Sequence, residues 1–131
     1  MNTVREILEN SKVIAVVGLS PKPHRDSHEV AKYLQGQEYR IVPVNPRADT
    51  ILGEKSYPDL PSIPGKVDVV DIFRRAEDVP PVVDQAIDIG AKAVWMQLGI
   101  VNEEAATQAR EAGLGVVMDR CMLVEHRNLA S

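Results

Sequence analysis

The first apolar run of this chain leads into a loop with the composition of a phosphate-binding site. Residues 13–17 are Val-Ile-Ala-Val-Val, and Gly18-Leu19-Ser20 follows them directly. A glycine there lets the backbone approach a phosphate, and the N–H groups that follow can point at its oxygens. A dinucleotide fingerprint would also place glycines at positions 20 and 23, which here are Ser20 and Pro23. The loop therefore predicts a nucleotide-phosphate site that departs from the standard NAD pattern.

A cation follows the second predicted strand, where an NAD site would have an acid. Residues 40–44 are Arg-Ile-Val-Pro-Val, and they end in Asn45-Pro46-Arg47. An NAD-binding unit usually offers a carboxylate there to the ribose hydroxyls, whereas an arginine suits a phosphate on the ribose. We therefore expect a phosphorylated adenine nucleotide, such as coenzyme A or NADP, rather than NAD.

Other predicted strands also end in polar or glycine residues. For one strand this has little weight, because loops are generally polar, but five together favour an anionic ligand lying across the strand ends. Arg25 and Ser27 add polar groups near the start of the following helix, for which Ser27 or Asp26 is the predicted cap. The remaining strand-end groups are Phe73-Arg74, Gln97-Leu98-Gly99 and Asp119-Arg120-Cys121.

The sequence lacks the familiar catalytic motifs. It contains no CxxC, HExxH, G-x-S-x-G or Walker A pattern, and its histidines show no metal-ligand spacing. Cys121 is the single cysteine, and His126 follows it by five residues in a predicted loop or helix start. A structural thiol is the favoured interpretation, because a cysteine nucleophile needs a neighbouring base. A mixed disulfide between Cys121 and the thiol of CoA stays open, since Cys121 follows the last strand at the same edge.

Alternating strand and helix patterns predict the scaffold that positions these residues. The pattern is typical of a parallel sheet covered on both faces, so we predict an α/β, Rossmann-like doubly wound domain with about five mostly parallel strands. Segment 48–66 is expected to hold a short strand and a turn of helix. The predicted strands are 13–17, 40–44, 67–73, 91–97 and 115–119, and the predicted helices are 4–10, 27–35, 79–89 and 103–112.

Composition limits the classes of partner. The chain has 131 residues, predicted to form one domain over 1–131, and its net charge of −4 argues against nucleic acid. No apolar run approaches the roughly 20 residues that span a membrane. The polar N-terminus is unlike a signal peptide, and a single cysteine fits a reducing compartment. We expect a cytoplasmic protein.

The strand-end segments, taken in order, resemble the small stand-alone CoA-binding proteins. That family is similar to the CoA-binding domain of the succinyl-CoA synthetase alpha subunit, and the resemblance covers residues 4–129. It implies a Rossmann-like fold with coenzyme A as the ligand. The segments that carry it are Gly18-Leu19-Ser20, Val44-Asn45-Pro46-Arg47, Asp71-Ile72-Phe73-Arg74, Trp95-Met96-Gln97-Leu98-Gly99 and Asp119-Arg120-Cys121-Met122.

The resemblance also implies roles for these residues. The loop of Gly18, Ser20 and residues 25–27 would face the diphosphate, and Asn45-Pro46-Arg47 the ribose and its phosphate. Phe73-Arg74 and Gln97-Leu98-Gly99 would line the rest of the groove. Ligase activity is not implied, because the resemblance includes neither a phosphohistidine domain nor an ATP-grasp domain.

Three functions remain open from sequence. A module that binds CoA or an acyl-CoA without chemistry of its own is favoured over an enzyme, and a protein partner or a homo-oligomer is compatible with it. The alternatives are an NADP-dependent reductase and a ligand-free adaptor on a degenerate Rossmann fold. The missing glycines of the fingerprint and the lack of a substrate domain argue against the reductase.

Overall fold

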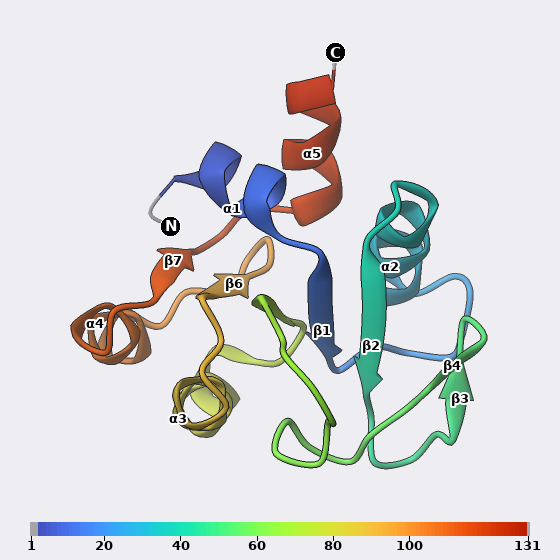
Figure 1. Cartoon of the computed structure of the whole chain (residues 1–131), viewed down its shortest axis with the longest axis horizontal. Coiled ribbons are helices and arrows are strands. Elements are labelled where there is room, and N and C mark those ends of the chain that lie inside the picture. Colours follow the sequence, from blue (N-terminus) through green and yellow to red (C-terminus); the bar gives the residue numbers. More distant parts are fainter. Residues whose placement is uncertain (1–2, 131) are drawn as a thin grey trace.

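Five parallel strands form the centre of the structure. The computed structural model describes residues 3–130. The central strands are β1 (Val13–Val17), β2 (Arg40–Val44), β5 (Val69–Ile72), β6 (Ala93–Met96) and β7 (Gly115–Val117). They lie side by side in the order β2-β1-β5-β6-β7, and every neighbouring pair is parallel (Figure 1). The predicted α/β fold with about five parallel strands is confirmed.

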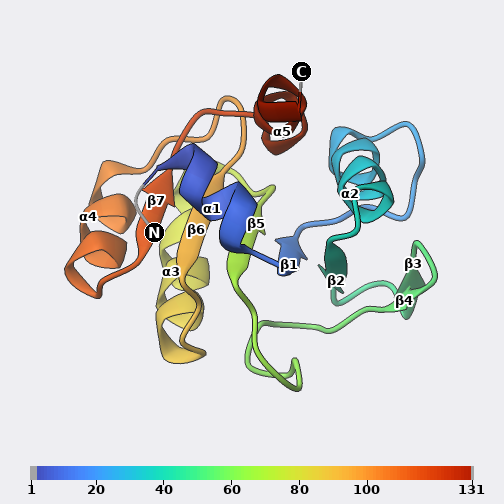
Figure 2. The same cartoon turned by 45° about the horizontal axis from the view of Figure 1, so that its top comes forward.

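Helices cover both faces of this sheet. In the described residues they are α1 (Val4–Asn10), α2 (Asp26–Gly36), the short 3-10 helix η1 (Ala76–Asp78), α3 (Val79–Asp88), α4 (Glu103–Glu111) and α5 (Met122–Ala130). Helices α1, α2 and α5 pack on one face, and α3 and α4 pack on the other (Figures 1 and 2). Because all five central strands run in one direction, their carboxyl ends lie at one edge of the sheet, where ligands bind in such folds.

Strand alternation divides the core into two layers. Ala15 and Val94 pack in the layer with α3 and α4, whereas Val16 and Trp95 pack with α1, α2 and α5. Trp95 is fully buried, and its indole Nε1–H donates to the carbonyl oxygen of Arg120 at 2.8 Å. Burying a large apolar side chain contributes about 1.5–3 kcal/mol to stability. The indole bond also ties β6 to the segment between β7 and α5.

The middle strand carries a carboxyl group inside the core. Asp71 on β5 is fully buried and lies in register between Val16 and Trp95. Neither of its carboxyl oxygens has a hydrogen-bond partner among the described residues. Burial raises the pKa of Asp71 well above its usual range, and the nearby N–H of Ile72 offsets this only in part. The carboxyl group therefore stays neutral over a wider pH range than an exposed aspartate.

The segment 48–66 differs from its prediction. It holds an antiparallel hairpin of β3 (Thr50–Ile51) and β4 (Glu54–Lys55), so the predicted turn of helix is wrong. Leu52 and Gly53 join the strands with φ angles of 55° and 77°, as a two-residue type I′ turn requires. Leucine rarely takes a positive φ, so the local sequence carries a weak turn signal.

The two helices beside the strand ends also differ from the prediction. Arg25 occupies the N-cap position of α2 and makes no side-chain cap, so the predicted cap by Ser27 or Asp26 is wrong. Both residues lie inside the first turn of α2. Helix α5 occupies the stretch after Cys121, where only a loop or a helix start is predicted, and its Met122 is fully buried in the core.

Candidate functional site

Gly18 closes the first strand in a conformation that suits glycine. Its φ is 86°, in the left-handed region that other residues rarely adopt. Its N–H donates to the carbonyl oxygen of Val44 at 3.0 Å, at the end of β2. The backbone beyond β5 packs directly against its Cα. The predicted phosphate-loop glycine is therefore held where three strand ends meet.

The loop after Gly18 is fixed to the start of α2 by its own polar groups. Ser20 N–H donates to the Oγ of Ser27 at 3.0 Å, and Lys22 N–H donates to the Oγ of Ser20 at 3.1 Å. His28 Nδ1 lies 2.9 Å from the carbonyl oxygen of Ser20. Because no side chain caps α2, its first-turn N–H groups are available to an anion. These bonds assign both serine hydroxyls to loop structure.

A first pocket, here named the Gly18 pocket, lies between this loop and α2. It has a volume of about 360 Å³. Lys22 and Arg25 bring positive charge to it, and the carboxylate of Asp26 stands at its edge. Its lining residues are Gly18, Ser20, Lys22, Arg25, Asp26, Ser27 and Phe73. The pocket combines a helix N-terminus with exposed cations, the combination that suits a phosphate group.

A second pocket, the Arg47 pocket, lies over the end of β2. Its volume is about 370 Å³, and it is lined by Gly18, Ser20, Asn45, Pro46, Arg47 and Arg74. Arg47 and Arg74 are exposed, and neither guanidinium has an ion-pair partner within residues 3–130. The lining contains no acid. Two unpaired guanidinium groups in one pocket favour a doubly charged anion such as a terminal phosphate.

Asn45 holds this pocket together. Its amide Nδ2 donates to the carbonyl oxygen of Leu19 at 2.9 Å, and its Oδ1 accepts from the N–H of Arg47 at 2.8 Å. Ser56 Oγ–H donates to the Asn45 carbonyl oxygen at 3.0 Å. The side chain of Asn45 thus joins the loops after β1 and β2 and positions the backbone of Arg47.

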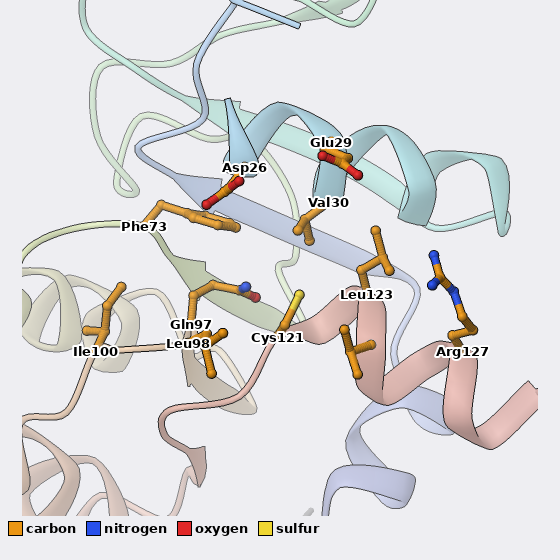
Figure 3. A pocket seen from close by; sticks show the side chains of 11 residues that line it. Asp26, Glu29, Val30, Phe73, Gln97, Leu98, Ile100, Cys121, Leu123 and Arg127 are labelled. Carbon is orange, nitrogen blue, oxygen red and sulfur yellow. The ribbon is translucent and has the colours of Figure 1, made fainter. Parts of the chain in front are cut away.

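A third pocket, the Cys121 pocket, lies between α2 and α5 over the ends of β5 and β6. Its volume is about 420 Å³. Figure 3 shows Asp26, Glu29 and Val30 on the α2 side, with Gln97 and Cys121 opposite them. Arg127 of α5 lies at one end, and much of the remaining lining is apolar. The full lining is Asp26, Glu29, Val30, Phe73, Gln97, Leu98, Ile100, Cys121, Leu123, Val124 and Arg127.

The three pockets adjoin one another along the strand ends. Gly18 and Ser20 line both the Arg47 pocket and the Gly18 pocket. Asp26 and Phe73 line both the Gly18 pocket and the Cys121 pocket. The order along the sheet edge is therefore a cationic pocket, a pocket at a helix N-terminus and a mainly apolar pocket. We name the whole the strand-end groove.

All but two of the predicted site residues line this groove. Leu19 is fully buried in the core, so only its backbone faces the loop, where its carbonyl oxygen accepts the bond from Asn45. Gly99 lines none of the three pockets, and its N–H donates to Oδ1 of Asp119 at 2.7 Å. The residues brought together are Gly18, Ser20, Arg25, Ser27, Asn45, Pro46, Arg47, Phe73, Arg74, Gln97 and Leu98.

The side chains of α2 and α5 that line the Cys121 pocket were not predicted from the sequence. Glu29 and Val30 come from α2, and Leu123, Val124 and Arg127 come from α5. A signal was present for α5, because Met122, Leu123, His126 and Leu129 follow helical spacing. Strand ends and the loops that follow them do not reveal which side chains the body of a helix presents to the groove.

Two other classes of site have no support in the described part of the chain. Residues 3–130 contain no group of three or more His, Cys, Asp or Glu side chains placed to hold a metal ion. Among the same residues, no helix has the length and apolar character needed to cross a bilayer.

The fold and groove define a Rossmann-like α/β domain with a groove at the carboxyl ends of its parallel strands, the place where such folds bind ligands. Comparison with known families then places the chain more closely. The profile of the CoA binding domain family matches residues 12–127, and the chain belongs to that family. The resemblance found from the strand-end residues is thereby confirmed.

Individual relatives agree with this assignment. The chain is 46% identical over 123 residues to the uncharacterized protein YneT of Bacillus subtilis (strain 168), covering 94% of this chain and 91% of that one. A hypothetical protein from Pyrococcus horikoshii OT3 has a solved structure with a TM-score of 0.94 and 48% identity, covering 98% of this chain and 90% of that one.

The relatives with a named activity are ligases. The chain is 29% identical over 133 residues to the alpha subunit of ADP-forming acetate–CoA ligase II from Pyrococcus furiosus. The match covers 92% of this chain but only 29% of the ligase subunit. The sequence resemblance compares the family with the CoA-binding domain of a succinyl-CoA synthetase, whereas this ligase relative is named for acetate.

Proposed function

We propose that this chain binds coenzyme A or an acyl-CoA along the strand-end groove and has no catalytic machinery of its own there. The observation that carries the proposal is the order of the three adjoining pockets. Coenzyme A has a ribose 3′-phosphate, a diphosphate and a pantetheine arm in the same order. Its charge is concentrated at one end and its apolar groups at the other, as in the groove.

The Arg47 pocket takes the ribose phosphate. Arg47 and Arg74 are free to approach it from two sides, and no carboxylate lines the pocket. A hydrogen bond to a charged group contributes about 1.5–3 kcal/mol. Asn45 supports this contact indirectly, because its Oδ1 fixes the N–H of Arg47. We therefore assign to Asn45 a positioning role rather than direct contact with the ribose.

The Gly18 pocket takes the diphosphate. The uncapped N-terminus of α2 points free N–H groups toward it, and Lys22 and Arg25 balance the charge. Asp26 lines the boundary with the Cys121 pocket, where its carboxylate opposes an anion. The diphosphate is therefore favoured on the Gly18 side of the boundary, and the uncharged arm continues past Asp26.

The Cys121 pocket takes the pantetheine arm. Val30, Ile100 and Leu123 offer apolar contacts to its methyl and methylene groups. Gln97, which is 4% exposed, offers a polar contact to its amides.

A thermal-shift panel tests the proposal. The melting temperature is measured with CoA, acetyl-CoA, dephospho-CoA, NADPH, NADH and ATP at equal concentrations. A ligand at a hundred times its Kd stabilises the folded state by about 2.7 kcal/mol, which the assay detects. CoA and acetyl-CoA are expected to raise the melting temperature most, dephospho-CoA less, and NADH little.

Each alternative gives a distinct pattern. A shift with NADPH larger than that with CoA favours the reductase, and no shift with any of the ligands favours the adaptor. An equal shift with CoA and NADH contradicts the assignment of a phosphate to the Arg47 pocket.

A further inference from the structure

Cys121 is held in the wall of the pocket proposed for the pantetheine arm. Its side chain is partly exposed and lines the Cys121 pocket, and Figure 3 shows its sulfur pointing into the space facing α2. Bonds to buried side chains fix the backbone on both sides of it. Arg120 carbonyl oxygen accepts from Trp95 Nε1 at 2.8 Å, and Met122 N–H donates to Gln97 Oε1 at 3.1 Å. The thiol is therefore both accessible and positioned.

Arg120 and His126, two basic residues near Cys121 in sequence, have other partners. The Arg120 guanidinium pairs with Glu125 at 3.4 Å, and His126 Nδ1 lies 2.8 Å from the hydroxyl of Tyr33. The start of α5 lies beside the thiol instead. Cys121 carbonyl oxygen accepts from Glu125 N–H at 3.0 Å, as an N-cap residue does.

A second and independent feature of this pocket points to a ligand. Gln97 is 4% exposed, and the N–H of Met122 requires its oxygen to face α5. The amide nitrogen then faces the other way, and within residues 3–130 no partner accepts from it. Gln97 lines the pocket, so this nitrogen is placed to donate to an acceptor that enters the pocket. An amide carbonyl of pantetheine is such an acceptor.

We propose that Cys121 forms a mixed disulfide with the pantetheine sulfur of coenzyme A, and this rests on the proposed binding of CoA in the groove. The co-reactant is a CoA disulfide. The Cys121 thiolate attacks the sulfur of the CoA half that occupies the groove. The S–S bond of the CoA disulfide breaks, and a new S–S bond joins Cys121 to that half. The second CoA leaves as a thiolate and takes up a proton, so no further oxidant is needed.

Binding in the groove makes this exchange selective. The nucleotide end, bound at the Arg47 and Gly18 pockets, raises the local concentration of the pantetheine sulfur beside Cys121. A disulfide without that nucleotide has only the Cys121 pocket to bind. CoA disulfide is therefore expected to react at least about tenfold faster than pantethine, the disulfide of pantetheine, at equal concentration.

Intact-mass spectrometry of the whole chain tests this. The protein is incubated with CoA disulfide, pantethine or glutathione disulfide, and the adduct is followed over time. Cys121→Ser is expected to form none. Arg47→Ala is expected to slow the reaction with CoA disulfide and to leave that with pantethine unchanged. Gln97→Glu keeps an acceptor for Met122 N–H but removes the amide donor, and is expected to slow both reactions.

Thermal shift with reduced CoA separates the failure of this inference from failure of the proposed function. Absence of an adduct, with CoA still raising the melting temperature, overturns the mixed disulfide and leaves CoA binding intact. Equal rates with all three disulfides overturn the selective reaction, and an absent CoA shift in the same samples removes the proposed function as well.

Discussion

A Cβ atom on Gly18 would lie 2.3 Å from the carbonyl oxygen of Phe73, a separation that real Cβ atoms do not show. Gly18 ends β1, and Phe73 follows β5 and lines both the Gly18 pocket and the Cys121 pocket. Gly18 also lines the Arg47 pocket, so these two backbones approach each other where the pockets of the groove adjoin. A side chain at position 18 would push Phe73 away and alter both pockets.

We expect Gly18→Ala to lower the stability of the fold and to weaken CoA binding together. The positive φ alone costs about 1–2 kcal/mol for a residue with a Cβ, and the collision with Phe73 adds to it. Gly65→Ala is the matched control, because Gly65 has the same φ of 86° and nothing within 4 Å of the added carbon. Urea denaturation should show a larger loss for Gly18→Ala. Equal losses for the two variants would contradict a role for the Phe73 contact.

We expect Arg47→Ala to weaken binding of CoA far more than binding of dephospho-CoA. Loss of a charged hydrogen bond of about 1.5–3 kcal/mol corresponds to about 10- to 100-fold in Kd. Titration calorimetry with both ligands checks this, and Arg110→Ala on α4 controls for net charge. If both ligands lose affinity equally, Arg47 contacts another part of the nucleotide.

We expect Asp26→Asn to tighten the binding of CoA. The Asp26 carboxylate is exposed and lines both the Gly18 pocket and the Cys121 pocket, where it would oppose the diphosphate of the proposed ligand. Exposed charge pairs contribute about 0.2–1 kcal/mol, so a gain in affinity of up to about fivefold is expected, and it should shrink as salt is added. Glu29→Gln, which lines only the Cys121 pocket, should gain less. A loss of affinity in Asp26→Asn would place the phosphates elsewhere.

We expect Asp71→Asn to stabilise the fold, and to do so increasingly as pH rises. Burial raises the pKa of Asp71 in the folded state, so its stabilising contribution is complete only below the unfolded value of 3.8. Above that pH the carboxyl group of the unfolded chain loses its proton first, so the free energy of unfolding falls until the pH passes the folded pKa. The asparagine variant has no proton to lose at this position, so its free energy of unfolding does not fall for this reason. Urea denaturation between about pH 5 and pH 8 should show a growing gap, and a constant gap would contradict a buried neutral carboxyl.

Asp68 should show the opposite pH dependence. Burial tends to raise its pKa, but bonds from the N–H groups of Val13 and Lys12, with Lys92 nearby, outweigh burial and lower it. Its contribution to stability is therefore present above 3.8 and lost as pH falls through the folded pKa. Asp68→Asn should lower the free energy of unfolding at neutral pH. In acid, the difference in this free energy between the variant and the native chain should become smaller. A difference that widens in acid would contradict these bonds.

The strands and the edge that holds the groove followed from local sequence. Residues 13–17 and 40–44 are predicted with the bounds that the structure has, because their mostly apolar runs end at Gly18 and at Asn45-Pro46, which mark turns. The last three strands are shorter than predicted. Parallel pairing then places every strand end at one edge, so most of the groove residues were predictable once the strands were known.

The tertiary structure decided which strand-end groups face the groove and what covers them. Leu19 and Gly99 follow their strands just as their groove-lining neighbours do. In the structure, however, the side chain of Leu19 is packed in the core, and the N–H of Gly99 donates to Asp119. Asn45 is predicted from sequence as a ligand contact, and the structure shows that its side chain also joins two loops. Helix α5 closes the Cys121 pocket through packing against distant elements. Local patterns report backbone preference and amphipathic faces, whereas these outcomes depend on contacts between segments far apart in the chain, and only the folded structure contains those.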